Sequence, residues 1–341
     1  MKNNQKLWGV LVHLSCDMWL GEQNEQPLKA VFDENMWNDI IEKTADSGMN
    51  TIVLDVGNGV RFFRHPEIAK EDAYSPEWVR EQVEKCRKKG IALIPKLNFS
   101  TAHDYWLGDY CRMISSSVYY KVTKELIEDV YEIFCHPQYI HLGMDEEDAK
   151  HKNGEEYVVY RKGKQYMHDL RYLVDCVRGL GATPWIWACP LFDMTELFVE
   201  EFSPDEIVIS PWYYNAFRRE HWTPVESRPE YVAYYNEGEY ATMNIKFVEE
   251  DPFLVNVRAK ALPLMEKGYR YIPCASVFNR CDWNTVDLME YFHDNDANEQ
   301  VIGFITAPWI RTMPTEKGKL FYEESFRFFK AAKEQIYGKI K

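Results

Sequence analysis

Residues 138–148 read Gln-Tyr-Ile-His-Leu-Gly-Met-Asp-Glu-Glu-Asp, a short apolar run that ends in four consecutive acids. The apolar part is typical of a buried β-strand. Side chains two positions apart in a strand share a face, so His141, Gly143 and Asp145 are predicted to point the same way. Glu146 then falls where the strand gives way to a loop. The sequence therefore predicts two adjacent carboxylates at the carboxyl end of a strand, with an imidazole one strand repeat earlier.

A run of acids is more often a solvated face or the first turn of a helix, where carboxylates complement the helix dipole. We keep this interpretation for Glu147 and Asp148. It does not account for the preceding His-x-Gly-x-Asp alternation, because a glycine inside a strand indicates close approach of a ligand or of other backbone. We therefore interpret Asp145 and Glu146 as a pair that can divide proton transfer and charge stabilisation between them.

Apolar strand patterns alternate with amphipathic helix patterns over the rest of the chain. The strands are predicted at residues 8–15, 50–56, 91–98, 138–143, 184–189, 206–212, 269–277 and 301–307. Helices are predicted at residues 33–47, 75–89, 118–135, 165–180, 229–235, 252–267 and 320–336. Eight strands alternating with helices predict an α/β fold, a (β/α)8 TIM barrel, and the alternative is a doubly wound open sheet.

The length of 341 residues suits one large domain, and the sequence contains no low-complexity linker. We expect residues 1–341 to form a single catalytic barrel. A long insertion is predicted at about residues 213–268, after the sixth strand. Insertions of this length after a strand are more often functional than idle.

The composition limits the kinds of binding partner and the cellular compartment that we expect for this protein. The net charge of −14 argues against a nucleic acid or an anionic membrane surface, because both need clustered Lys and Arg. The eight cysteines form no C-x-x-C pair, which favours reduced thiols, a cytoplasmic location and no zinc site. We expect no cofactor. The 11 Trp and 22 Tyr suit stacking on sugar rings, or simply a core of large residues, and an acidic, aromatic-rich surface is compatible with a homodimer.

The carboxyl ends of the predicted strands, where the active sites of (β/α)8 barrels lie, carry polar and aromatic side chains. They are His13 and Asp17, Asp55 and Asn58, Asn98 and His103, His141 with Asp145 and Glu146, Trp187, Trp212 with Tyr213 and Tyr214, Asn279 with Asp282, and Trp309. Tryptophans at such ends can wall a sugar ring while carboxylates and amides hold its hydroxyls. These ends have no Gly-rich phosphate cradle and no Lys or Arg cluster, which favours carbohydrate over phosphate chemistry.

The order His141-x-Gly143-x-Asp145-Glu146 resembles the motif of glycoside hydrolase family 20, the β-N-acetylhexosaminidases. The similarity spans nearly the whole chain. The other similar segments are Met49-Asn50 with Asp55, residues 94–98 running to His103, Trp187, residues 210–212 and residues 303–309. The resemblance implies a catalytic barrel that cleaves terminal β-linked N-acetylhexosamine by substrate-assisted retention, in which the 2-acetamido oxygen of the substrate attacks the anomeric carbon.

The same resemblance implies roles for individual residues. Glu146 would be the general acid and later the base, and Asp145 would hold the acetamido N–H and stabilise the oxazolinium-like intermediate. Trp187, Trp212 and Trp309 would box the sugar. Tyr213, Tyr214 or a tyrosine of the long insertion would bond the acetamido carbonyl. His141 would support a hydrogen-bond network near Glu146, with a satisfied core histidine as its alternative. Asp55, Asn98 and His103 would complete the substrate site.

The sequence departs from the family pattern at three strand ends. Ser15-Cys16-Asp17 stands where an arginine is usual, and Asp17 would take its place at the sugar hydroxyls. Asn98 replaces an aspartate, and Asn279 and Asp282 are the candidates at the seventh strand. Two other interpretations follow: a glycosidase for another sugar or an endo-acting enzyme, pairing Glu146 with Asp55 or Asp282, and a sugar-binding barrel without turnover.

Overall fold

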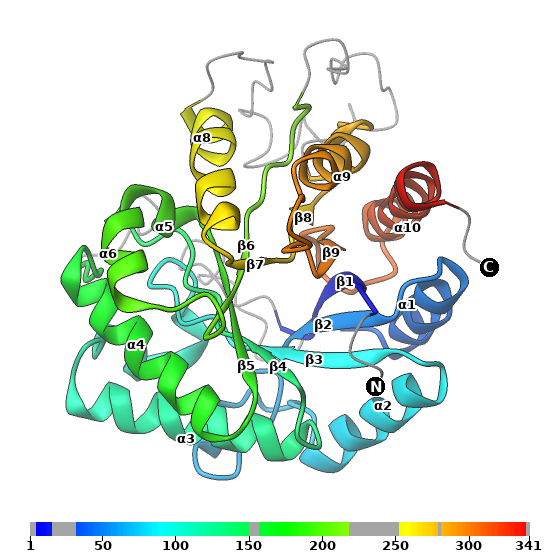
Figure 1. The fold of residues 1–341 in the computed structure, drawn as a ribbon. Helices are drawn as coiled ribbons and strands as arrows, with labels where there is room; N and C mark the ends of the chain where they lie inside the picture. The colour runs from blue at the N-terminus through cyan, green and yellow to red at the C-terminus, as the bar shows by residue number, and fades with distance from the viewer. Residues whose placement is uncertain (1–4, 16–31, 150–156, 218–251, 279–280, 339–341) are drawn as a thin grey trace.

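The protein was studied as a computed structural model that describes residues 5–15, 32–149, 157–217, 252–278 and 281–338 (Figure 1). The strands are β1 (Leu7–His13), β2 (Thr51–Asp55), β3 (Ala92–Lys96), β4 (Tyr139–His141), β5 (Thr183–Trp187), β6 (Val208–Ser210), β7 (Arg270–Tyr271), β8 (Cys274–Ala275) and β9 (Gly303–Thr306). They form one parallel sheet in the order β7-β6-β5-β4-β3-β2-β1-β9-β8. Each predicted strand region thus contains a strand.

The sheet closes on itself through residues 270–275. On one side Ile272 N donates to Ile209 O at 3.1 Å, and on the other Ile302 N donates to Tyr271 O at 2.9 Å. This segment is the predicted seventh strand, and it is divided into β7 and β8 around Pro273, whose nitrogen has no hydrogen to donate. The predicted (β/α)8 barrel is confirmed, and the open-sheet alternative is wrong.

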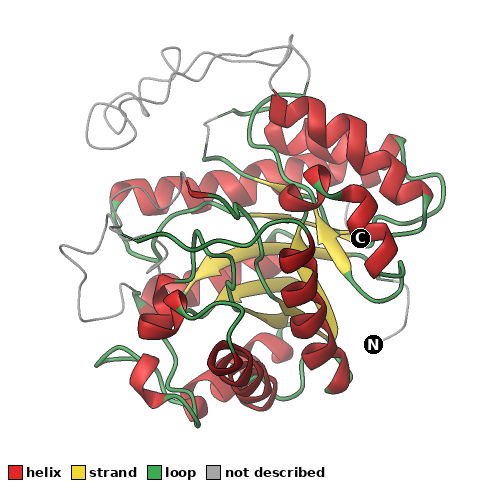
Figure 2. Cartoon of the chain, turned by 90° about the vertical axis from the view of Figure 1, so that its left-hand side faces the viewer, coloured by secondary structure: helices red, strands yellow, loops and turns green. Residues whose placement is uncertain are grey.

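Helices surround the strands, which lie at the centre of the molecule (Figure 2). The helices are α1 (Glu34–Asp46), α2 (Pro76–Lys88), α3 (Ser117–Ile133), α4 (Lys164–Gly179), α5 (Cys189–Asp193), α6 (Thr195–Glu201), α8 (Pro252–Glu266), α9 (Asn284–Asp294) and α10 (Glu316–Tyr337), with short 3-10 helices η2 (Pro66–Ile68) and η3 (Tyr105–Arg112). The predicted helix at residues 229–235 lies outside the described residues. Helices α5, α6 and α9 were not predicted from the sequence.

Local signals explain where the predicted helices begin. Asp33 caps α1 by accepting a hydrogen bond from Met36 N, and Ser75 caps α2 by accepting one from Trp78 N. Pro76 follows in the first turn of α2, where its missing N–H costs nothing. No helix in the described part of the chain is both long and apolar enough to cross a membrane. No disulfide joins any of the cysteines that the structure describes.

The barrel interior has an apolar floor and a polar upper layer. The apolar cluster comprises Leu11, Val53, Ile94, Tyr139, Trp185, Trp187, Val208, Ile272, Cys274, Ile305 and Ala307, and Trp187 at the end of β5 reaches the mouth. One strand repeat after Leu11, Val53, Ile94 and Tyr139, His13 pairs in register with Asp55, Asp55 with Lys96, and Lys96 with His141. Neighbours in register point to the same face of a sheet, so these four side chains form a row at the carboxyl ends of the strands.

Candidate active site

The row His13–Asp55–Lys96 is a buried ionic cluster under the barrel mouth. Lys96 Nζ donates to Asp55 Oδ2 at 2.6 Å, and His13 Nδ1 lies 3.3 Å from the same oxygen. Burial alone raises the pKa of Asp55, but the charge of Lys96 and the hydrogen bond from His13 lower it to about 2. The predicted site residue Asp55 is thus already paired, and Lys96, which the sequence analysis did not place in the site, is its partner.

His141 is buried and neutral. Its Nδ1 accepts a hydrogen bond from Gly143 N at 3.0 Å, which leaves the ring proton on Nε2. Burial and the nearby charge of Lys96 hold the pKa of His141 well below its usual value. The ring packs against Trp185 and Trp187, with centroids 4.8 and 4.5 Å away. His141 Nε2 has no hydrogen-bond partner among the described residues, so it is a donor available at the barrel mouth.

Gly143 is required by both its conformation and its surroundings. Its φ is 74°, in the left-handed region, and a Cβ at this position would come within 2.0 Å of Asn98 Oδ1. The close approach is present, and it is made mainly by the side chain of Asn98. The predicted strand alternation through Gly143 and Asp145 is wrong, because β4 ends at His141 and the chain then turns through left-handed conformations. Asn98 also accepts hydrogen bonds from Ser100 N and from Trp106 Nε1, so it supports the loop after β3.

Asp145 and Glu146 converge on His103. His103 Nε2 lies 2.8 Å from Glu146 Oε2 and 3.3 Å from Asp145 Oδ2. Burial lowers the pKa of His103, but the charges and hydrogen bonds of the two carboxylates outweigh it and raise this pKa to about 10. Burial likewise raises the pKa of Asp145, but the charge of His103 holds it below its usual range. At neutral pH the site therefore contains an imidazolium between two acids, and His103, not His141, contacts Glu146.

The turn that carries the two acids is strained, and hydrogen bonds to each of its carbonyl groups stabilise it. Met144 and Glu146 have φ values of 67° and 43°, which cost roughly 1–3 kcal/mol each in residues other than glycine. Each carbonyl along the turn has a donor. Trp187 N bonds Gly143 O, Tyr166 OH bonds Met144 O, Ser100 Oγ bonds Asp145 O, and Asp148 N bonds Glu146 O. The Glu146 side chain remains 27% exposed, as access to a substrate requires.

Glu147 is not part of a solvated run, which corrects the interpretation made from the sequence. Its side chain is only 3% exposed and pairs with Arg161, which is 1% exposed, at a distance of 2.8 Å. Arg161 gave no signal in the sequence, because a single arginine in a polar loop has many ordinary uses. Its partner became visible only once the loops after β3 and β4 were placed together.

Aromatic rings wall the mouth on the β5, β6 and β9 sides. Trp187 and Trp309 lie 5.8 Å apart between centroids, and Tyr214 lies 6.1 Å from Trp309. Trp212 stacks on Tyr214 at 4.8 Å. Tyr213 instead packs edge-on against Phe217, away from this wall. Of Tyr213 and Tyr214, the structure thus brings Tyr214 to the wall. The tyrosines of residues 218–251 in the predicted insertion lie outside the described residues.

Two residues of the predicted site, Asp17 and Asn279, lie outside the described residues. Asp282 is half-buried just before α9. The structure adds Cys189 to the site, at the start of α5, where its thiol contacts the Glu146 backbone and Trp212. Burial raises the pKa of the Cys189 thiol well above its usual value, so it is a packing group and not a nucleophile.

The acids and His103 also have the spacing of a cation site. Within the described ranges, their ligand atoms lie within 4.8 Å of one another. A histidine must be neutral to ligate a metal, whereas the two carboxylates raise the pKa of His103 to about 10. The donor set therefore fits a shared proton better than a metal ion.

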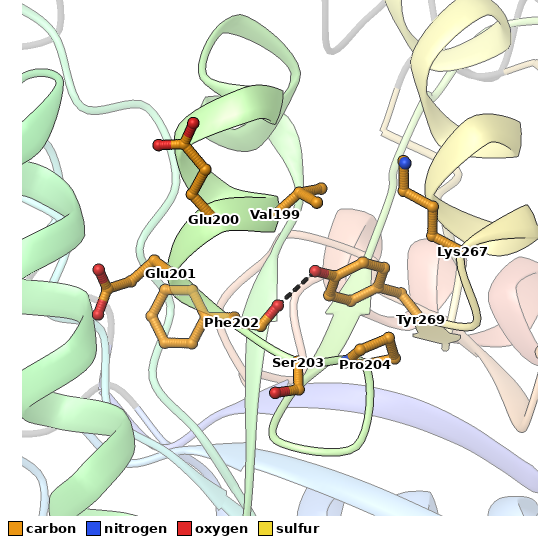
Figure 3. Close-up of a pocket in the computed structure, with 8 residues that line it drawn as sticks. All are labelled: Val199, Glu200, Glu201, Phe202, Ser203, Pro204, Lys267 and Tyr269. Carbon is orange, nitrogen blue, oxygen red and sulfur yellow. Dashed lines mark hydrogen bonds between the residues drawn. The ribbon is translucent and has the colours of Figure 1, made fainter.

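A shallow pocket of about 360 Å³ lies at the opposite end of the barrel (Figure 3). Its lining residues Ser203 and Pro204 precede β6, and Tyr269 precedes β7. Tyr269 OH donates to Phe202 O at its centre. This end of a (β/α)8 barrel serves stability, so we place no chemistry there.

No model of a known protein family matches the sequence, and no curated protein matches it. Solved structures do match the fold. Dispersin B is 14% identical with a TM-score of 0.58, covering 98% of this chain and 100% of that one. The β-N-acetylhexosaminidase from Bacteroides fragilis NCTC 9343 is 13% identical with a TM-score of 0.60, covering 97% of this chain and 66% of that one. The structure resembles a family 20 barrel.

Two further matches define what this likeness shows. A family 20 exo-β-N-acetylglucosaminidase from Vibrio harveyi is 12% identical with a TM-score of 0.60, and the match covers 96% of this chain and 54% of that one. A glycoside hydrolase family 5 enzyme from Prevotella bryantii B14 is also 12% identical, with a TM-score of 0.53. At these identities the comparisons show the barrel fold, and the site residues must carry the function.

Proposed function

We propose that the protein is a glycoside hydrolase that removes terminal β-linked N-acetylhexosamine by substrate-assisted, retaining catalysis. The observation that carries the proposal is the pair Asp145 and Glu146 sharing the proton of His103 under an aromatic wall. The fold likeness to β-N-acetylhexosaminidases supports it.

Glu146 is the proposed general acid. It is the more exposed of the two carboxylates, and it lies 2.8 Å from an imidazolium that can supply the proton for the leaving oxygen. Once the glycosidic bond has broken, the ionised Glu146 would take a proton from water and pass it to the neutral His103. Both groups then return to their starting states, so the proton cycle closes without any other group.

Asp145 is proposed to bind the acetamido group of the substrate. Its pKa is held low by the charge of His103, so it stays ionised and can accept a hydrogen bond from the acetamido N–H. Asp145 Oδ1 is buried without a hydrogen-bond partner among the described residues, and it is the acceptor available for that role. A negative charge here would also stabilise the positive oxazolinium-like intermediate.

Retention follows from the proposed substrate assistance, because the acetamido oxygen and then water would each invert the anomeric carbon. The separation of Asp145 and Glu146 does not bear on this outcome, since Asp145 would bind the acetamido group and would not activate water. The pairing of Asp55 with Lys96 weakens the alternative in which Asp55 serves as the second catalytic acid.

The experiment that tests the proposal is hydrolysis of aryl β-glycosides of GlcNAc, GalNAc, glucose and galactose, run beside Glu146→Gln. We expect release from the N-acetyl sugars alone, inhibition by a thiazoline mimic of the intermediate, and loss of turnover in the variant. Release from glucose or galactose at equal rates would overturn substrate assistance. Binding of chito-oligosaccharides without any release would instead indicate a sugar-binding barrel.

A further inference from the structure

Glu147, the residue after the proposed acid, is held by four hydrogen bonds. Its Oε1 accepts from Arg161 N at 3.0 Å and from Arg161 Nε at 2.8 Å. Its Oε2 accepts from Thr101 N at 3.0 Å and from Arg161 Nη2 at 3.2 Å. The carboxylate therefore ties the turn after β4 to the loop after β3 and to residue 161, which precedes α4.

Arg161 extends these ties to the barrel wall. Its Nη2 also donates to Phe99 O, and its Nη1 lies 3.5 Å from Asp169 Oδ2 on α4 and 3.5 Å from the hydroxyl of Tyr119 on α3. Asp169 is anchored in turn by Tyr120, Gln165 and Ser115. The guanidinium thus joins two helices to the two loops that carry Glu146 and His103.

These contacts act on the strained part of the turn. Glu146 has a φ of 43°, and its backbone conformation persists only if the residues on either side are fixed. Ser100 fixes the Asp145 carbonyl on one side. On the other side, the side chain of Glu147 supplies the fixed point. A bond rotation at residue 146 would swing its carboxylate away from His103.

We propose that Glu147 and Arg161 are positioning residues that hold the turn of residues 144–147 so that Glu146 meets His103. This inference rests on the proposed function only for its kinetic consequence. The geometric consequence, the contact between Glu146 and the imidazole, can be measured whether or not the protein is a hexosaminidase.

The first test is histidine side-chain NMR on the full chain, comparing the wild type with Glu147→Gln. The His103 signal is assigned by its loss in His103→Gln, and the other histidines are internal controls. The groups that face His103 in the structure are Asp145 and Glu146, which raise its pKa to about 10. We expect this pKa to fall toward the ordinary histidine value of about 6.5 in Glu147→Gln, because the acids lose their fixed place. An unchanged His103 titration would overturn the proposal.

The second test is kinetic, with the aryl N-acetyl-glycoside that the wild type hydrolyses. We expect Glu147→Gln to lower kcat by about 10–100-fold, as for a misplacement of about 1 Å. KM should change by less than about threefold, since no residue that contacts the sugar is altered. A wild type without activity would refute the proposed function, and the NMR result would still decide the inference.

Asp129→Asn is the matched control. Asp129 is also a buried carboxylate, 1% exposed, paired with Arg64 at 2.7 Å, and none of its hydrogen bonds reaches residues 144–147. Both variants should lose stability, but only Glu147→Gln should change the His103 titration and kcat. If both variants lowered kcat equally at matched folded fractions, the effect would be one of general stability and the proposal would fail.

Discussion

Glu146 and Glu147 are neighbours in the chain, yet they occupy opposite environments. The Glu146 side chain is 27% exposed, has a left-handed backbone and contacts an imidazolium whose proton it can accept. The Glu147 side chain is 3% exposed and receives four hydrogen bonds, three of them from Arg161. One carboxylate is partly exposed and contacts His103, and the other is buried and fully hydrogen-bonded.

The difference shows how the strained turn of residues 144–147 can be stabilised. A half-open carboxylate beside a second acid and a histidine is poorly restrained by its own contacts. The neighbouring carboxylate of Glu147 is buried and forms hydrogen bonds that fix the surrounding loops. Function and restraint are divided between consecutive residues.

The largest expected effect is the loss of turnover when Glu146, the exposed residue of the pair, is replaced. Glu146→Gln removes the proposed acid while keeping its shape, so turnover of substrates with poor leaving groups should fall by about 10²–10⁴-fold. Its unfolding free energy should also fall, because the variant loses the charge that Glu146 places 2.8 Å from the His103 imidazolium. Steady-state kinetics and denaturant unfolding measure the two quantities, and full activity on natural glycosides would rule out Glu146 as the acid.

The next largest effect is the loss of stability when Arg161, the partner of the buried Glu147, is replaced. Arg161→Met leaves the buried Glu147 and Asp169 carboxylates without their cation and should lower the free energy of unfolding by about 3–5 kcal/mol. Urea unfolding monitored by tryptophan fluorescence gives this value. A loss below that of an ordinary surface substitution would mean that the pair is not buried in solution.

The pH dependence of stability probes the imidazolium between the acids. His103 has a folded pKa of about 10, above the unfolded value of about 6.5, so its stabilisation is complete below pH 6.5 and lost as the pH rises through 10. Between these values the wild type should lose on the order of a few kcal/mol more than His103→Gln does. Equal slopes for the two proteins in urea unfolding at several pH values would contradict the charged state of His103.

The smallest expected effect concerns the aromatic wall. Trp187 Nε1 is buried without a hydrogen-bond partner among the described residues, so we predict that it donates to the substrate. Trp187→Phe keeps a ring but removes this donor, and KM should rise by about 2–10-fold, the value of one hydrogen bond of about 0.5–1.5 kcal/mol. Unchanged KM values across the substrate panel would place the sugar elsewhere along the wall.

The main part of the fold could be predicted from the sequence because each strand and helix signal is local. The apolar run before Asp145 and the cap at Asp33 are both readable within a few residues. Helix α9 was missed, and its start lacks a side-chain cap: Trp283 stands at the N-cap position. The closure of the sheet through residues 270–275 depends on hydrogen bonds to residues in and next to β6 and β9, which no local pattern contains.

The candidate site divides in the same way. The sequence by itself determined that two adjacent acids and a glycine follow the fourth strand and that aromatic residues follow others, since strand ends are readable locally. The turn that replaces the expected strand alternation, and the approach of Asn98 to Gly143, came only with the folded chain. Only the tertiary structure decided that His103 joins the acids, that Lys96 neutralises Asp55, and that Glu147 is buried against Arg161. The physical reason is that charge pairing depends on distance and burial between loops far apart in the chain, and a sequence specifies neither until it is folded.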